Sequence, residues 1–224
     1  MLVMINPNCA NCPEKPCYQG ITGKKAWPSF CPMRNFPDLV QSTRALYRDD
    51  NIHRFFLEAA ITEREAYAVK PAREEGRTVP VRPRIRELSA FAHKLGIQHV
   101  GLAFCVGLAE EAKRAARILE NRQLKVSSVC CACGVIDKTE LGIPKEEKIR
   151  NPENFEASCN PLLQAEVLNR VETGFNIIVG LCVGHDMLFT KYSRAPVTTL
   201  VVKDRFTGHN PVITLYSRYH REIV

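Results

Sequence analysis

The sequence predicts an α/β protein whose main part is a Rossmann-like parallel sheet of about four strands, in the order 2-1-3-4, with flanking helices. From about residue 84 onward, short apolar runs alternate with helical segments, which is the pattern of βαβ units. Two of these runs lead into the same tripeptide, Cys-Val-Gly, at residues 105–107 and 182–184. A length of 224 residues suffices for one such domain and an appendage.

The first 83 residues are expected to form two smaller parts. Residues 1–36 are rich in Cys, Pro, Gly and Asn, so we expect a cysteine-rich arm that needs a bound metal to hold it together. Residues 37–83 are expected to form a helical segment and a linker. Apolar residues recur near the helical period as far as Tyr67, Lys70-Pro71 ends the helical pattern, and Glu74–Pro83 has the composition of an extended linker.

Residues 84–224 are expected to form the α/β domain, in which helices and strands alternate. The predicted helices are Arg84–Leu95, Leu108–Asn121, Asn160–Glu172 and a short helix from about His185. The predicted strands are Gln98–Phe104, Lys125–Cys130, Asn176–Leu181 and Thr198–Lys203. Right-handed crossovers then allow the first and third strands to be neighbours, with the switch point of the sheet between them.

Cysteines follow several of these strands, and the carboxyl ends of parallel strands share one edge of the sheet. Cys105 and Cys182 end the first and third strands, and further cysteines flank other turns of the same unit. We therefore expect a second thiol-rich site, which would bind a metal or an iron–sulfur cluster. Its expected ligands are Cys105, Cys131, Cys159 and Cys182, and Cys130 or Cys133 could replace Cys131 because the end of the strand is not fixed by the pattern.

The amino-terminal arm carries the clearest spacing motif. Cys9-x2-Cys12-x4-Cys17-x13-Cys31 offers four thiols, and a Cys-x2-Cys turn directs two of them at one ion. Zinc more often takes two paired arms, whereas iron–sulfur clusters accept uneven spacing and a Cys-Pro pair such as Cys31-Pro32. The spacing therefore does not decide between zinc and a [4Fe-4S] cluster at this site.

A protein that binds a metal or a cluster could have a redox role with a partner protein. Two other functions are alternatives to metal or cluster binding. In the first, Cys182 is the nucleophile of a thiol enzyme assisted by His185, and the amino-terminal arm binds a structural zinc. His209, in the turn after the last strand, lies on the same predicted edge. In the second, a zinc arm binds protein or nucleic acid through an arginine-rich linker that contains Arg73, Arg77, Arg82, Arg84 and Arg86.

Composition and motifs narrow the class of protein. No apolar run approaches a membrane span and the start lacks a signal-peptide pattern, so we expect a cytoplasmic protein without membrane contact. In that compartment ten cysteines indicate metal ligation or catalysis rather than disulfides. The net charge of +7 is weak support for nucleic-acid binding, which we do not expect. No Walker loop, G-x-G-x-x-G or H-E-x-x-H motif supports a nucleotide or metalloprotease site.

Three strings of the sequence resemble a known family: Cys159–Asn169, Gly180–Asp186 and Ala195–Arg205. The family is a cysteine-rich prokaryotic domain of unknown function, described for metal-binding proteins of archaea and anaerobic bacteria. The amino-terminal Cys9, Cys12, Cys17 and Cys31 resemble its first block, so the resemblance spans nearly the whole chain. It implies metal binding and an anaerobic setting suited to iron–sulfur chemistry, but it brings no established activity.

Overall fold

The computed structural model describes residues 6–23, 25–69 and 78–221, and it divides into two units at residues 1–60 and 61–224. The first unit contains a short 3₁₀ helix, η1 (Cys9–Asn11), followed by the helices α1 (Pro32–Asn35) and α2 (Pro37–Leu46). Helix α3 (Asp50–Glu65) begins in the first unit and ends in the second. Proline at the first position of α1 and of α2 suits a helix start, because a proline there lacks only an N–H that would be unpaired.

A two-stranded antiparallel sheet replaces part of the expected helix and linker. Strand β1 (Tyr67–Val69) pairs with β2 (Thr78–Pro80), whereas the sequence led us to expect helix as far as Tyr67 and an extended linker to residue 83. The Lys70-Pro71 helix end and residues 74–77 of the linker lie outside the described residues. Short strands of three residues give too weak an alternation to be recognised from sequence.

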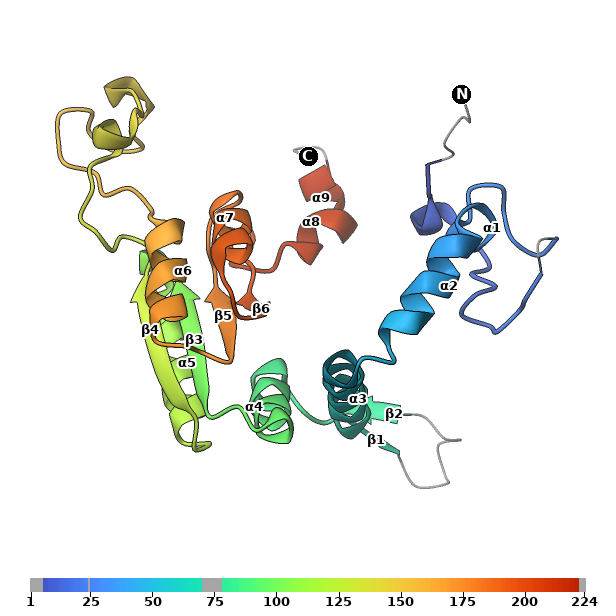
Figure 1. Ribbon diagram of the computed structural model, residues 1–224. Coiled ribbons are helices and arrows are strands. Elements are labelled where there is room, and N and C mark those ends of the chain that lie inside the picture. The colour runs from blue at the N-terminus through green and yellow to red at the C-terminus, as the bar shows by residue number, and fades with distance from the viewer. Residues whose placement is uncertain (1–5, 24, 70–77, 222–224) are drawn as a thin grey trace. The chain divides into compact units, whose positions relative to one another are not determined.

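The second unit is built on a four-stranded parallel sheet with the order β4-β3-β5-β6 (Figure 1). In sequence order this is 2-1-3-4, and β3 and β5, which precede the two Cys-Val-Gly turns, are immediate neighbours. The strands are β3 (His99–Phe104), β4 (Lys125–Cys130), β5 (Phe175–Val179) and β6 (Val197–Val201). The predicted Rossmann-like α/β class is therefore confirmed.

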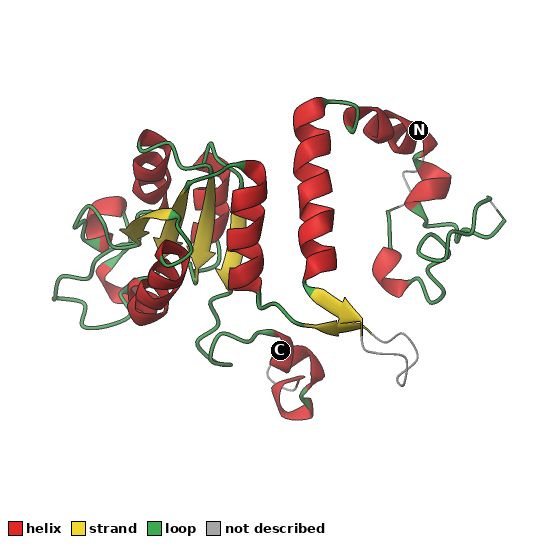
Figure 2. Cartoon of the chain, turned by 90° about the horizontal axis from the view of Figure 1, so that it is seen from below, coloured by secondary structure: helices red, strands yellow, loops and turns green. Residues whose placement is uncertain are grey.

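Helices cover both faces of this sheet (Figure 2). They are α4 (Arg84–Leu95), α5 (Ala109–Glu120), α6 (Pro161–Arg170) and α7 (His185–Tyr192), and the chain continues into α8 (Val212–Tyr216) and α9 (Arg218–Arg221). The chain crosses from β3 to β4 in one direction and from β4 back to β5 in the other. Right-handed crossovers therefore put α5 on one face, and α6 with its neighbour α7 on the opposite face.

The core lies between the sheet and these helices and extends to the carboxyl edge. Val100 and Leu102 of β3, Ile177 of β5 and Leu119 of α5 are fully buried. Gly180, directly after β5, has φ +69, and a Cβ there would lie 1.9 Å from Cδ1 of Leu108. Only glycine therefore allows the turn after β3 to pack against the end of β5, which brings the two Cys-Val-Gly turns together.

Candidate metal centre

The chain places cysteines at the carboxyl edge by extending the sheet hydrogen bonds beyond the strands. The Cys105 N–H donates to the carbonyl of Val179 at 3.2 Å, and the Cys131 N–H donates to the carbonyl of Phe104 at 2.8 Å. Cys105 and Cys131 are 4% and 3% exposed, so both thiols lie in the apolar core at this edge. The structure thus selects Cys131 from the three adjacent cysteines as the one that faces Cys105.

A folded loop between β4 and α6 brings Cys159 to the same place. Its two ends pair across a narrow stem, in which the Asn160 N–H donates to the Cys131 carbonyl at 2.7 Å and the Ser158 N–H donates to the Ile136 carbonyl at 2.8 Å. Asn160 also accepts the Leu163 N–H at 3.0 Å and so caps α6, whose first residue is Pro161. Cys159 is therefore held between the stem and the start of a helix.

Cys182 and His185 come from the turn that joins β5 to α7. The His185 and Asp186 N–H groups donate to the Cys182 carbonyl at 3.0 and 3.1 Å, which starts the helix. Gly184 at the N-cap has φ +85, a conformation that glycine adopts easily. This tight turn places the thiol and the imidazole side by side.

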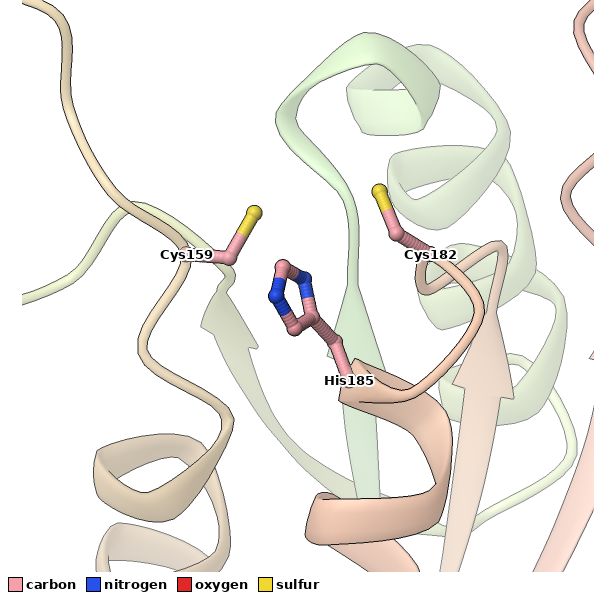
Figure 3. A group of neighbouring side chains, drawn as sticks. All are labelled: Cys159, Cys182 and His185. Carbon is pink, nitrogen blue, oxygen red and sulfur yellow. The ribbon is translucent and has the colours of Figure 1, made fainter. Parts of the chain in front are cut away.

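Within the described residues, Cys159, Cys182 and His185 form a group whose ligand atoms all lie within 4.8 Å of one another. Figure 3 shows the imidazole of His185 between the side chains of the two cysteines. Nδ1 of His185 is buried without a hydrogen-bond partner. A buried ring nitrogen needs either a hydrogen-bond partner or an ion, and thiolate and imidazole together are zinc-type ligands.

The other two predicted cysteines continue this group inward. The Cys105 thiol is hydrogen-bonded to Cys131, and Cys131 is hydrogen-bonded to Cys159. The Val106 N–H donates to Sγ of Cys131 at 3.3 Å. The structure therefore brings together Cys105, Cys131, Cys159 and Cys182, to which it adds His185.

These contacts divide the thiols by acidity. The hydrogen bond with Cys131, followed by burial, raises the pKa of Cys105 to about 12. Cys105 lowers the pKa of Cys131, but the hydrogen bond to Cys159 and burial outweigh it and raise that pKa to about 11. The hydrogen bond with Cys131 lowers the pKa of Cys159. Cys159 therefore becomes a thiolate more readily than the two thiols behind it.

Two cations that the sequence analysis did not single out contact the sulfur atoms. The ammonium of Lys203 donates to Sγ of Cys105, and the guanidinium of Arg205 donates to Sγ of Cys182 at 3.4 Å. Both residues follow β6, the fourth strand to end at this edge. Their position after a parallel strand was the signal that could have identified them. Positive charge beside several sulfur atoms favours the thiolate form that binds metals.

The remaining predicted residues lie elsewhere. Among the described residues, the amino-terminal cysteines are not part of the group within 4.8 Å: Cys12 and Cys31 are buried, and Cys9 and Cys17 are exposed. His209 is also outside the group, and its Nδ1 accepts the Asp204 N–H at 3.2 Å. In the arginine-rich linker, Arg82 pairs with Glu65 at 2.8 Å.

Fold and site together define an α/β protein with a doubly wound parallel sheet and a thiol-rich carboxyl edge. The chain belongs to the family described as Protein of unknown function (DUF1847), whose model matches residues 31–200. It is 38% identical over 212 residues to the uncharacterized protein MJ0455 of Methanocaldococcus jannaschii, covering 95% of each chain. No solved structure matches the chain.

These comparisons confirm the resemblance to a family of unknown function. Cys105, Cys131, Cys159, Cys182 and His185 all lie within the matched residues, whereas the first three cysteines of the amino-terminal arm precede them. In the described part of the chain, no helix is both long and apolar enough to cross a membrane.

Proposed function

We propose that this protein binds a metal at the carboxyl edge of its sheet, through Cys159, Cys182 and His185, with Cys131 next in line as a fourth ligand. The observation that carries this proposal is the group of two sulfur atoms and one imidazole within 4.8 Å, in which the buried Nδ1 of His185 has no other partner. The loop before α6 and the turn after β5 both bring ligand atoms to this place. Cysteines that only fill the core would not need to lie beside a histidine.

The donor set favours zinc as the ion. Thiolate ligands suit Cu(I), zinc and iron–sulfur clusters, and imidazole suits zinc, copper, iron and nickel, so a site with both donors fits zinc well. Three ligands from the group and Cys131 would complete a Cys3His tetrahedron, with Zn–S distances of about 2.3 Å. A [4Fe-4S] cluster on Cys105, Cys131, Cys159 and Cys182 is the alternative, and it would leave His185 without a role.

The test is anaerobic purification of the full chain, followed by metal analysis and a visible absorption spectrum. We expect a colourless protein with bound zinc, and Cys182→Ser should lose that metal while Ser127→Ala, on the middle of β4, retains it. Broad visible absorbance, lost in Cys105→Ser but kept in His185→Ala, would assign a cluster instead. Identical metal content in wild type and Cys182→Ser, with Cys12→Ser present in both, would overturn the site.

The amino-terminal arm remains a second proposed centre, formed by Cys9, Cys12, Cys17 and Cys31 and binding zinc or [4Fe-4S]. It is supported by the spacing of the motif and by the burial of Cys12 and Cys31 in a segment with little other core. Cys12→Ser should release one metal and make residues 1–36 sensitive to protease, while circular dichroism shows the sheet intact. Unchanged metal content in this variant would refute the second centre.

One contact favours a different function, that of a thiol enzyme with Cys182 as nucleophile. Arg205 donates to Sγ of Cys182, and the imidazole of His185 is adjacent, which is an environment that activates a thiol. In that case iodoacetamide should alkylate Cys182 first in the protein as isolated, and Cys159→Ser should leave the rate unchanged. If a metal binds the thiol, chelator treatment should be needed before Cys182 reacts.

A further inference from the structure

Two cysteines at the end of β4 are left outside the metal group. Cys130 is the last residue of the strand and Cys133 lies in the turn that follows, and both are half-buried. Cys131 between them is buried and hydrogen-bonded to Cys105 and Cys159. Neither Cys130 nor Cys133 belongs to the group of ligand atoms within 4.8 Å. The pair Cys130-x2-Cys133 therefore lies beside the proposed metal site and is separate from it.

The backbone holds this pair at the spacing that a disulfide needs. The Cys133 N–H donates to the Cys130 carbonyl at 3.3 Å, so the two residues are the first and fourth positions of a hydrogen-bonded turn. The Cα atoms at the ends of such a turn are less than about 7 Å apart. Disulfides join Cα atoms that are about 4.4 to 6.8 Å apart. The Cα spacing of this turn is therefore compatible with a disulfide.

Backbone strain lies just beyond this turn, at Val135. Gly134 has φ +100, and Val135 has φ +53, which is rare for a β-branched side chain. Val135 is also 76% exposed, so burial of its side chain does not account for this conformation. Strain of this kind persists where the surrounding structure fixes it and is frequent at functional sites.

Partial exposure of Cys130 and Cys133 leaves the pair accessible to a small thiol reagent. We propose that Cys130 and Cys133 form a redox-active dithiol that undergoes thiol–disulfide exchange with a low-molecular-weight disulfide. One cysteine thiolate attacks the external disulfide, forms a mixed disulfide and releases one thiol. The second cysteine then attacks the mixed disulfide, closes the Cys130–Cys133 bond and releases the second thiol. Two cysteine thiols are oxidised and one external disulfide is reduced to two thiols, and a dithiol reductant reverses the reaction.

The experiment uses the full metal-loaded chain, equilibrated anaerobically in buffers of increasing oxidised glutathione. Free thiols are alkylated, and peptides are sequenced by mass spectrometry. The expected result is loss of two alkylatable thiols at Cys130 and Cys133, restored by dithiothreitol. Disulfides that join Cys130 to any other cysteine, or a pair that stays reduced while other cysteines oxidise, would overturn the proposal.

Matched variants separate the dithiol from the metal site. In Cys133→Ser, Cys130 should stop at the mixed disulfide with glutathione, and Cys130→Ser should trap Cys133 in the same way. Both variants should keep the metal content of the wild type, because neither residue belongs to the group of ligands. Loss of metal from either variant would make these residues ligands and refute the dithiol, whereas absence of metal from the wild type would affect only the metal proposal.

Discussion

At the scale of single residues, the most informative contacts are those between cations and sulfur. Lys203 and Arg205 donate to Cys105 and Cys182 from a segment that is remote in sequence from either cysteine. Groups that donate to metal-binding residues fix their orientation and charge, and their loss typically costs about 10- to 100-fold in metal affinity. Lys203 is therefore expected to strengthen metal binding without being a ligand, and this effect can be measured separately from the loss of a ligand.

Lys203→Met should weaken metal binding by about 10-fold or more, because the variant keeps the apolar stem but leaves Cys105 without its charged donor, and Cys105 is hydrogen-bonded to the proposed fourth ligand, Cys131. The affinity is measured by competition with a chromophoric chelator. Lys113→Met, on the exposed side of α5, is the control and should bind like the wild type. Equal affinities in the two variants would mean that the ammonium does not support the site.

Part of this site could be predicted from the sequence because the handedness of crossovers constrains the sheet. Cys105 and Cys182 could be placed together because right-handed crossovers fix which parallel strands are neighbours. The distinction between Cys130, Cys131 and Cys133 could not be made, since a shift of one residue in the end of a strand turns a side chain to the other face. His185 stayed uncertain because adjacency in sequence does not determine where an imidazole points.

At the scale of elements, the loop between Cys131 and Cys159 depends on two carboxylates. Asp137 accepts the N–H groups of Thr139 and Glu156 at 2.9 and 2.8 Å, and it pairs with Lys148. Glu156 pairs with Lys138 and accepts the Arg150 N–H at 2.9 Å. The sequence showed only a polar loop here, because such long-range contacts to the backbone have no periodic pattern.

Acid should loosen this loop before it unfolds the sheet. Hydrogen bonds from the Thr139 and Glu156 N–H groups lower the pKa of Asp137 below its ordinary 3.8, and Lys138 lowers the pKa of Glu156 below 4.5. The stabilisation is complete above these ordinary values and is lost as the pH falls below them toward the lower folded pKa values. The hydrogen-exchange protection factors of residues 137–158, which correct for the intrinsic exchange rate at each pH, should therefore fall between about pH 5 and pH 2.

The control for this prediction is the exposed ion pair between Lys145 and Glu153 in the same loop. Glu153→Gln should leave the acid transition where it is, since exposed pairs contribute little. Asp137→Asn should already show fast exchange at pH 7. Slow exchange of residues 137–158 in Asp137→Asn would show that the carboxylate does not hold the loop.

At the scale of the whole molecule, the sheet of residues 84–224 was predictable and the first 83 residues were only partly so. Buried and mostly apolar runs such as Phe175–Val179 identify central parallel strands because both of their faces are covered. The amino-terminal arm offers no such run, and its division from the rest at residue 60 falls inside a continuous helix. Periodicity cannot show where one helix passes from one packed unit to another.

The stem that pairs Cys131 with Asn160 holds Cys159 beside the turn after β5, and this arrangement affects how the protein unfolds when a metal is bound. The proposed ligands come from connections after β4 and β5, so an ion bound to them would act as a removable cross-link between segments that separate when the sheet opens. Binding to the folded state alone stabilises it by about 2.7 kcal/mol when free metal is about 100 times Kd. The melting temperature of the wild type should rise with the logarithm of free zinc, and that of Cys159→Ser should not. If both proteins melted at the same temperature with and without zinc, no bound ion would cross-link the connections after β4 and β5.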